Sequence, residues 1–339
     1  MHCAQENGTQ AEVGLAVIDE AAADRLRRRV ARFRRAGLFS GCGDNVVIER
    51  ATSADDLREA YALVHRVFLE QGFINPQMGG LRLRVFEALP EMATFVAKIE
   101  GKVIAVTSVV PDSIDLGLPS DKCFLPELDS LRTAGRRISE ITNLAVDPEY
   151  RNTPVFFELT RCCFAHAMAH GCDDLFIAIS PEHARFFEQV LLFEPMGEQR
   201  SYSAEIEDIV EGKRLNLQGL EERAIARDAV LREEALLHDF FYRQNVYHRK
   251  VRTWAELARR TFLTPALLAD LFVSSSQFLA RCDDQEIWSI RRRWGSDLFA
   301  KIWPPKSWWQ KVATIAQGQF QRRMPSLVQV FRGIRAASF

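Results

Sequence analysis

The segment covering residues 137–151 constrains the fold of this 339-residue chain more than any other part of it. Ile, Leu, Ala and Val dominate residues 138–146, and Pro148 follows them, so the pattern predicts a buried strand that ends at the proline. Glu140 lies inside this apolar strand. A carboxylate among apolar side chains is costly to bury without a partner or a chemical role, so Glu140 is the first candidate for a functional residue.

The residues after this strand predict a helix, a strand and a second helix, in that order. Thr153 is a suitable N-cap, Pro154 suits the first helical position, and the helix is expected to reach His170. A short apolar strand is expected at residues 175–179, and another helix opens at Ser180. This alternation of strand and helix predicts a mixed α/β domain.

Two further strands and a helix are predicted upstream. The runs 94–99 and 103–110 are joined by Glu100-Gly101-Lys102, which is a hairpin signal. Residues 113–135 are rich in Pro, Leu and Asp and are expected to form a long connection. Nearer the start of the sequence, residues 19–36 predict a helix that contains seven arginines.

Composition divides the chain into three parts. All six tryptophans lie after residue 253, and the sequence after about residue 217 is almost wholly helical in pattern. We therefore predict a leader with the Arg-rich helix at residues 1–44, an α/β domain at residues 45–212, and a helical domain at residues 213–339. The net charge of −1 gives the whole molecule no general preference for nucleic acid.

Cysteine and histidine usage argues against disulfides and metals. The seven cysteines are odd in number and form no C-x-x-C pair, which favours a reducing cytoplasm over a disulfide framework. His166 and His170 are four residues apart, but no third ligand is evident, so no metal site is expected.

The sequence gives two indications about membranes. No run approaches the about 18 consecutive apolar residues of a membrane span. Residues 301–339 contain seven basic residues and no acid, so this tail is expected either to contact the inner membrane face or a carrier protein, or to pack its tryptophans into the helical domain.

Taken together, these residues resemble the GNAT superfamily of acyltransferases and, within it, the long-chain N-acyl amino acid synthases, which are related to the acyl-homoserine-lactone synthases. Residues 140–146 (Glu-Ile-Thr-Asn-Leu-Ala-Val) are similar to the Glu-x-Ser-Arg-x-Ala-Val run of lactone synthases. Residues 118–119 and 131–137 look like the synthase pattern, and residues 184–197 resemble the helix-to-strand signature that closes GNAT acyl sites. The resemblance covers residues 45–207.

The resemblance implies a fold, an activity and its partners. The fold is a GNAT-type mixed, mostly antiparallel sheet flanked by helices and splayed near Ala145 and Val146, with an added C-terminal helical domain. The activity is that of an enzyme that transfers a long-chain acyl group from an acyl carrier protein thioester to the amine of an amino acid. Acyl carrier protein and an amino acid are its expected partners, and neither a metal nor a redox cofactor is required.

Two departures from the family pattern are informative. Residues 151–156 contain no glycine where acetyl-CoA-using members place a Gly-rich phosphate loop, and Pro154 lacks an N–H donor. CoA carries a pyrophosphate, whereas the arm of a carrier protein carries one phosphate diester, so the weaker cradle favours the carrier and leaves acyl-CoA as the alternative donor. Phe187 stands where many GNAT enzymes have a tyrosine that protonates the leaving thiolate.

The resemblance places the catalytic centre on the buried strand. Glu140 is the expected base, accepting a proton from the amine directly or through water; bracing Arg136 or Arg137 is its structural alternative. The backbone of Ala145, with that of its neighbours Leu144 and Val146, is expected to polarise the thioester carbonyl and to pair with the pantetheine amides.

Five more residues are expected to bind substrate. Thr142 and Asn143 contact substrate or pantetheine, or else supply only edge-strand polarity. Arg132 and Arg136 are candidates for the carboxylate of the amino acid, because a guanidinium matches a carboxylate bidentately, with surface solvation as the alternative. Arg151, at a helix start, is the candidate phosphate ligand.

Three alternative functions stay open. They are an autoinducer-type synthase, an acyltransferase for another amine with acyl-carrier or acyl-CoA donors, and a non-catalytic module that binds acyl carrier protein. A lactone synthase would also need an adenosylmethionine site, and the sequence identifies none.

Overall fold

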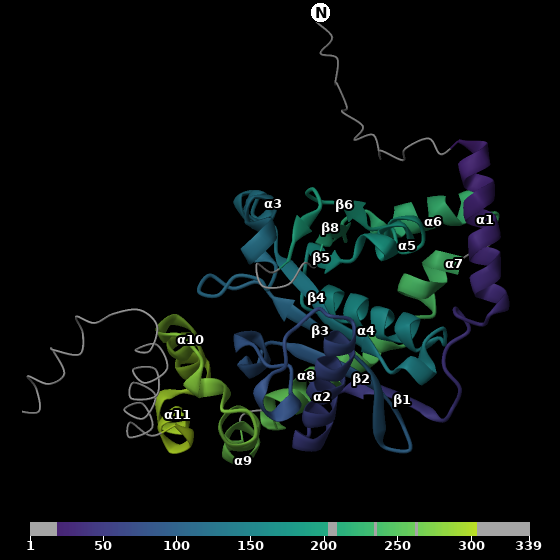
Figure 1. Ribbon diagram of the computed structural model, residues 1–339. Coiled ribbons are helices and arrows are strands. Elements are labelled where there is room, and N and C mark those ends of the chain that lie inside the picture. The colour runs from purple at the N-terminus through teal and green to yellow at the C-terminus, as the bar shows by residue number, and fades with distance from the viewer. Residues whose placement is uncertain (1–18, 203–208, 234–235, 262–263, 304–339) are drawn as a thin grey trace, which may run out of the picture.

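The computed structural model describes residues 19–202, 209–233, 236–261 and 264–303, drawn as coloured ribbon in Figure 1. These residues form an eight-stranded sheet in the order β1-β2-β3-β4-β5-β8-β6, with β7 also pairing with β8. Among the described strands only β4 and β5 pair in parallel. The strands are β1 (Val46–Arg50), β2 (Ala93–Ile99), β3 (Lys102–Pro111), β4 (Ile138–Val146), β5 (Asp174–Ile179), β6 (Glu194–Pro195), β7 (Arg200–Ser201) and β8 (Ile209–Asn216).

Helices cover both faces of this sheet, so the predicted fold class is confirmed. The α-helices are α1 (Glu20–Arg35), α2 (Ala54–Glu70), α3 (Asp121–Thr133), α4 (Val155–Ala169), α5 (Pro181–Gln189), α6 (Leu220–Leu231), α7 (Leu236–His238), α8 (Tyr247–Thr261), α9 (Pro265–Ala269), α10 (Asp284–Trp294) and α11 (Ser296–Ile302). The short turns are η1 (Met78–Gly80), η2 (Val85–Ala88), η3 (Pro148–Tyr150), η4 (Asp239–Arg243), η5 (Asp270–Ser274) and η6 (Phe278–Ala280). None of the described helices is long and apolar enough to cross a bilayer.

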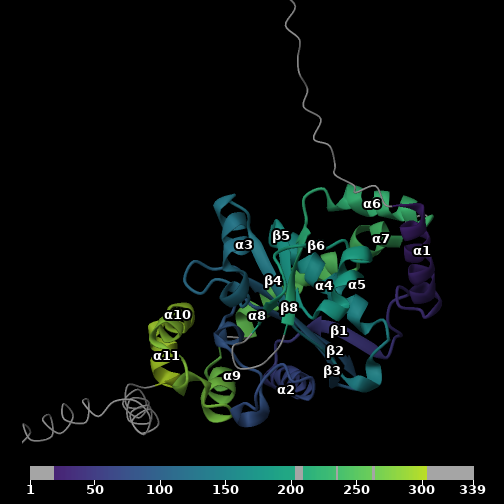
Figure 2. The same cartoon turned by 45° about the horizontal axis from the view of Figure 1, so that its top comes forward.

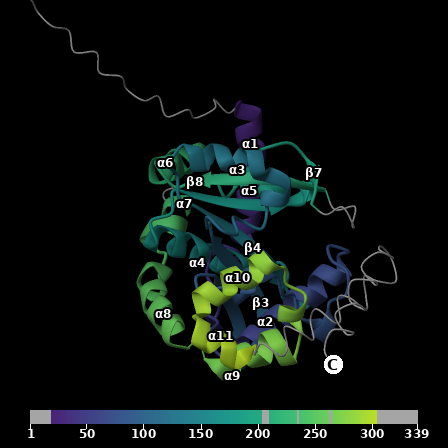
Figure 3. The same cartoon turned by 90° about the vertical axis from the view of Figure 1, so that its left-hand side faces the viewer.

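Alternating side chains of the strands separate two hydrophobic cores. Val106 and Val110 of β3 face the core beneath α2, α3 and α9–α11. Ile104 and Val109 face the opposite core, beneath α1, α4 and α6–α8. The helix α8 lies beside α4 in this second layer (Figure 3).

The helices that follow β8 therefore belong to both layers of the sheet. Figures 1 and 2 show α10 and α11, in yellow, at the opposite side of the molecule from α1, in purple. The strand β8 crosses the boundary predicted at residue 212, and that domain division stays a prediction. The leader before residue 19 and the basic tail after residue 303 lie outside the described residues.

Several predicted elements are confirmed and one prediction is wrong. The hairpin is present as β2 and β3, with both Glu100 and Gly101 at positive φ, and the Arg-rich helix is α1. The expected long connection at residues 113–135 instead contains α3, which tolerates Pro126 because a break at Phe124 (φ −122°, ψ 25°) precedes it. Composition alone concealed this helix, because prolines near a helix start are compatible with helix formation.

A β-bulge distorts β4 at the centre of the sheet. Val106 pairs with Ala145 and Ser108 with Thr142, so β4 spans three residue steps where β3 spans two. The extra residue is accommodated at Asn143, whose φ is 54°. Asn adopts this left-handed conformation more readily than other non-glycine residues, and bulges of this kind redirect neighbouring side chains.

The two parallel strands separate along their length. β4 and β5 pair only at Ile138, Ser139 and Glu140, opposite residues 174–176. Beyond Glu140 the strands are no longer bonded to each other, so the sheet splits there. We expected the strands to splay near Ala145. The split instead opens five residues earlier, at Glu140, and Ala145 lies farther along the gap.

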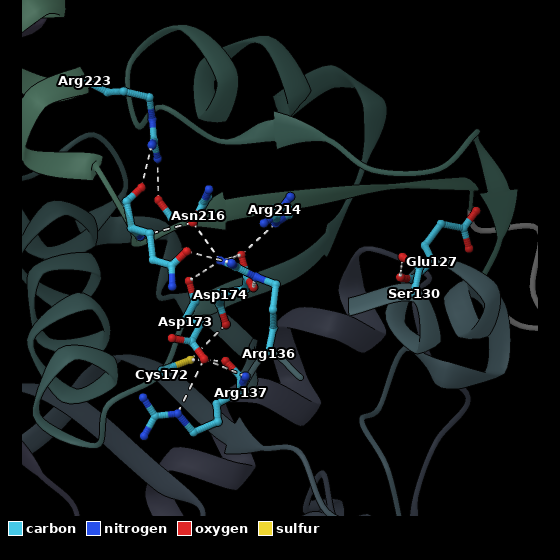
Figure 4. A network of polar contacts seen from close by, with 11 residues as sticks. Glu127, Ser130, Arg136, Arg137, Cys172, Asp173, Asp174, Arg214, Asn216 and Arg223 are labelled. Carbon is cyan, nitrogen blue, oxygen red and sulfur yellow. Dashed lines mark hydrogen bonds and ion pairs between the residues drawn. The ribbon is translucent and has the colours of Figure 1, made fainter. Parts of the chain in front are cut away.

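A charge cluster fixes the closed end of this split. Asp174, fully buried at the start of β5, accepts hydrogen bonds from Arg136 Nη2 (2.9 Å) and Arg214 Nε (2.7 Å). Arg136 Nη2 also donates to Asn216 Oδ1 of β8 (2.8 Å). Figure 4 shows these side chains converging on Asp174, which joins the ends of β4, β5 and β8.

Candidate active site

The split leads into a cavity of about 640 Å³. Its size lies within the roughly 300–1,000 Å³ of ligand pockets. Residues 140–146 of β4 and residues 177–180 form two of its walls, and the start of α4, the end of α2 and α5 complete them. Its lining residues come from both faces of the sheet, so the cavity passes through the gap between the strands.

One part of the cavity is polar and another is aromatic. Arg82, Arg84, Glu140 and Tyr202 line the polar part. The aromatic part is a phenylalanine cluster. The ring centroid of Phe186 lies 5.6 to 5.8 Å from the ring centroids of Phe33, Phe156 and Phe157. A ligand with a charged end and an apolar end matches this division.

Glu140 faces this cavity from the last position at which β4 pairs with β5. Its side chain is 2% exposed and accepts hydrogen bonds from the backbone N–H (2.9 Å) and the hydroxyl (2.8 Å) of Ser120. Burial raises the pKa of the Glu140 carboxyl to about 7, against the opposing effect of these hydrogen bonds. Glu140 contacts neither Arg136 nor Arg137, so the structural alternative of an arginine brace is wrong.

Ser120 supports Glu140 from the start of α3. It is the N-cap of that helix and is fully buried, but its hydroxyl points to Glu140 instead of capping the helix. A helix N-terminus stabilises negative charge, so Ser120 favours the ionised form of the base. Sequence reasoning missed Ser120 because the contact joins residues 20 positions apart.

The bulge residue Asn143 lies in a buried polar network with Arg84 and Glu87. Glu87 is fully buried, accepts from Arg84 Nη2 at 2.7 Å and accepts from Asn143 Nδ2 at 2.9 Å. Arg84 also donates to Asn143 Oδ1 at 3.1 Å and to Thr142 Oγ1 at 3.4 Å. Burial alone would raise the pKa of the Glu87 carboxyl, but the charge of Arg84 holds it below its usual value. Thr142 and Asn143 therefore line the cavity and are held in place by this network.

The two arginines predicted to bind carboxylate do not reach the cavity. Arg136 is held by Asp174 at the closed end of the split (Figure 4), and Arg132 is bound by Asp112, Asp121 and Asp129. Neither lines the cavity among the described residues. Their role as substrate ligands is therefore wrong, because carboxylates of the chain itself already occupy both guanidinium groups.

The predicted phosphate ligand and backbone groups do lie at the cavity. Arg151 lines it, and no described residue bonds its guanidinium group. Leu144, Ala145 and Val146 also line it. Thr153 is not the N-cap of α4; its hydroxyl donates to Tyr150 O at 2.7 Å, and the helix begins one residue later than predicted.

The cavity also contains a tyrosine. Phe187 lines the cavity but has no acidic proton to donate, whereas Tyr202 lines the polar part of the cavity and has a hydroxyl group. Burial raises the pKa of the Tyr202 hydroxyl to about 12, and the charge of Glu140 contributes to that rise. Tyr202 is therefore a neutral O–H group close to the expected base.

Comparison with known proteins agrees with this geometry. The family model of the N-acyl amino acid synthase FeeM matches residues 59–208, which include β2 to β5 and most of the cavity walls. The match covers less than half of the 339-residue chain. The matched family is that of an N-acyl amino acid synthase, and the match indicates an acyltransferase. No curated protein sequence matches the chain.

Solved structures with similar folds include FeeM itself, an N-acyl amino acid synthase from uncultured soil microbes. The FeeM structure has 20% sequence identity and a TM-score of 0.47, and the match covers 54% of this chain and 96% of FeeM. The CoA-dependent acyl-homoserine lactone synthase BjaI has 14% identity and a TM-score of 0.37, covering 56% of this chain and 92% of BjaI. An N-acetyltransferase from Staphylococcus aureus has 18% identity and a TM-score of 0.39, covering 51% of this chain and 99% of that protein.

Proposed function

We propose that this chain transfers a long-chain acyl group from the phosphopantetheine thioester of an acyl carrier protein to the α-amine of an amino acid. The observation that carries the proposal is the position of Glu140, a buried carboxyl with a pKa of about 7 at the point where the sheet splits into a cavity. A base with this pKa is partly ionised near neutral pH, which suits general-base catalysis.

The proposed step balances without a metal or a redox cofactor. The amine nitrogen attacks the thioester carbonyl carbon, Glu140 accepts the amine proton directly or through water, the C–N bond forms and the C–S bond breaks. The departing thiolate takes up the proton from Glu140, which regenerates the carboxylate, so the products are an amide and a free thiol. The edge of β4 from Ile141 to Val146 lacks a strand partner on the β5 side, which supports pairing with the pantetheine amides and polarisation of the carbonyl by backbone N–H groups.

The aromatic part of the cavity supports a fatty acyl group. The phenylalanine cluster of Phe33, Phe156, Phe157 and Phe186 offers an apolar wall on the opposite face of the sheet from Tyr202. Burying each methylene of an acyl chain against such a wall contributes about 0.8 kcal/mol. A long chain therefore gains more binding energy here than an acetyl group.

The outer face of α1 supports a protein-borne donor. Positions spaced three or four residues apart share one face of a helix. Four exposed arginines of α1 have this spacing, and no described acid pairs with them: Arg25, Arg28, Arg32 and Arg35. The same helix contributes Phe33 to the cavity wall. This Arg25–Arg35 stripe would attract an acidic carrier protein. With such a donor, the expected compartment of the protein is still the cytoplasm, with contact at the inner membrane face.

A direct assay tests this function. Purified full-length protein is incubated with acyl carrier protein charged with a long acyl chain, a mixture of the twenty standard amino acids and a thiol reagent, and products are identified by mass spectrometry. Thiol release that requires an amino acid and yields its N-acyl derivative supports the proposal. Tight carrier binding without thiol release contradicts it, and faster turnover with acyl-CoA contradicts the carrier as donor.

Charge reversal on α1 tests the carrier. We expect Arg28→Glu/Arg32→Glu to raise the KM for the acyl-carrier donor by about tenfold or more, because like charges replace attraction, and the effect weakens at high salt. The KM for a short acyl-pantetheine thioester should not change. Arg252→Glu, an exposed reversal on α8, is the matched control. Equal effects on both donors would contradict docking at α1.

Removing the hydroxyl of Ser120 tests the environment of the base. We expect Ser120→Ala to raise the pKa of Glu140, because one hydrogen bond to its ionised form is lost, and to move the rising limb of the kcat profile up by about one pH unit. Ser130→Ala is the control, since Ser130 lies exposed on the same helix and donates only to Glu127 O. An unmoved midpoint would show that the hydroxyl does not act on the base.

A further inference from the structure

We propose that the guanidinium group of Arg82 binds the α-carboxylate of the acceptor, so that the polar part of the cavity selects amino acids over amines that lack an acid group. The inference rests on the proposed function, because it specifies the acceptor for the same cavity. It replaces the arginines predicted from the sequence with one that the fold places beside the base.

The local backbone directs Arg82 into the cavity. Residues 81–84, with the sequence Leu-Arg-Leu-Arg, join η1 to η2 in an extended conformation. Alternation along an extended chain puts Leu81 and Leu83, which are 3% and 4% exposed, in the core, and Arg82 and Arg84 at the cavity. Arg82 N donates to Tyr61 O of α2 at 3.0 Å, which fixes this segment against α2.

The two arginines differ in their partners. Arg84 is engaged by Glu87 and Asn143, as described above. Arg82 Nε is buried without a hydrogen-bond partner, and no described acid forms an ion pair with its guanidinium group. A buried charge without a counter-ion is costly to maintain. In this part of the cavity, Arg82 is therefore the cation that no acid of the described residues neutralises.

The surrounding charges leave a place for an anion. Arg82, Arg84 and Lys122 are the nearby cations, and Glu87 and Glu140 the nearby acids. Burial, together with the charge of Arg84, lowers the pKa of Arg82 to about 10. Burial and these two arginines likewise lower the pKa of Lys122. These three cations outnumber the two acids even when Glu140 is ionised, so a bound carboxylate would stabilise the site.

The placement of Arg82 relative to Glu140 fits an α-amino acid. Arg82, Arg84, Glu140 and Tyr202 line the same polar part of the cavity, and the charges of the first three act on the Tyr202 hydroxyl. In an α-amino acid one carbon separates the amine from the carboxylate. A guanidinium group binds a carboxylate through two parallel hydrogen bonds, which would hold the acceptor while its amine faces Glu140.

The test compares acceptors with and without the carboxylate. Wild type, Arg82→Met and Arg82→Lys are assayed with the amino acid that turns over fastest, with its carboxamide and with its decarboxylated amine. We expect Arg82→Met to raise the KM for the free acid by about 10- to 100-fold, because a charged hydrogen bond is lost, and to leave the KM for the carboxamide unchanged. Arg82→Lys should recover part of the preference for the acid, and Arg66→Met on the exposed side of α2 is the control.

Two binding measurements keep the inference testable without turnover. Calorimetric titration of wild type with each of the twenty amino acids and each carboxamide should show tighter binding of free acids, and Arg82→Met should abolish that difference. Arg82→Met should unfold at the same temperature as wild type or higher, since it removes an unpaired buried charge. Equal affinity of wild type for acid and carboxamide, or a lower unfolding temperature of Arg82→Met with an unchanged preference, would overturn the role of Arg82. Absence of thiol release with acid-selective binding would instead count against the proposed function alone.

Discussion

Replacing Glu140 by Gln is expected to lower kcat by about 100- to 10,000-fold, the usual contribution of a general base. The substitution keeps the shape of the side chain, and the amide oxygen can still accept from Ser120 N, which donates to Glu140 at 2.9 Å in the wild type. Loss of activity would therefore report the loss of the proton acceptor. The measurement is thiol release under saturating donor and amino acid.

The pH dependence separates a base from a merely structural acid. Glu140 must be ionised to accept a proton, and burial raises its pKa to about 7, so kcat of the wild type should rise with pH through that value. Glu140→Gln should lack this rising limb. Unchanged turnover, or an unchanged limb, in the Gln variant would remove Glu140 from the mechanism.

The same substitution should change stability in the opposite direction to activity: kcat falls, but the free energy of unfolding does not. The pKa of Glu140 is higher in the folded protein than its usual value, so protonated Glu140 stabilises the fold and this contribution is lost as pH rises toward about 7. Gln cannot ionise. We expect the free energy of unfolding of Glu140→Gln, measured at pH 8, to equal or exceed that of the wild type.

Glu87→Ala is expected to destabilise the protein by about 3–5 kcal/mol, the loss typical of a broken buried ion pair. Glu87 is fully buried and is the carboxylate that holds Arg84 and Asn143. Its removal leaves the Arg84 guanidinium buried without a counter-charge beside the bulge. Urea denaturation followed by circular dichroism measures the change.

The control for Glu87→Ala is an exposed ion pair. Arg137 is 69% exposed in its side chain and lies 3.4 Å from Asp173. Such pairs contribute about 0–1 kcal/mol, so Arg137→Ala should shift the unfolding midpoint little. A loss below about 1 kcal/mol for Glu87→Ala would mean that water or rearrangement compensates the charge of Arg84, and the network would not fix the bulge.

The sequence predicted the elements whose signals are local. The apolar run of β4, the Glu100-Gly101 turn and the amphipathic spacing of α1 are each contained within a few residues, and all three are confirmed. Glu140 was identifiable for the same reason, because its unusual surroundings lie on its own strand.

The rest of the site depends on contacts between distant residues. Ser120 meets Glu140 only because α3 begins beside β4, and no local pattern shows this. Arg136 was assigned to substrate because an arginine before a strand has the same appearance whether its partner is a ligand or Asp174. The alternating Leu-Arg-Leu-Arg of residues 81–84 was a usable signal for Arg82, since period-two alternation puts both arginines on one face.

The charge cluster around Asp174 has a consequence for how this enzyme can change its specificity. β4 and β5 form a wedge whose apex is held by Arg136, Arg214 and Asn216, whereas Glu140 lies at the last paired position, where the wedge begins to open. A small rotation at the apex is magnified toward the wide end, where the acyl chain would enter. Substitutions at the apex can thus change the width of the opening, and with it the size of the ligand admitted, while the residues that line the cavity stay the same.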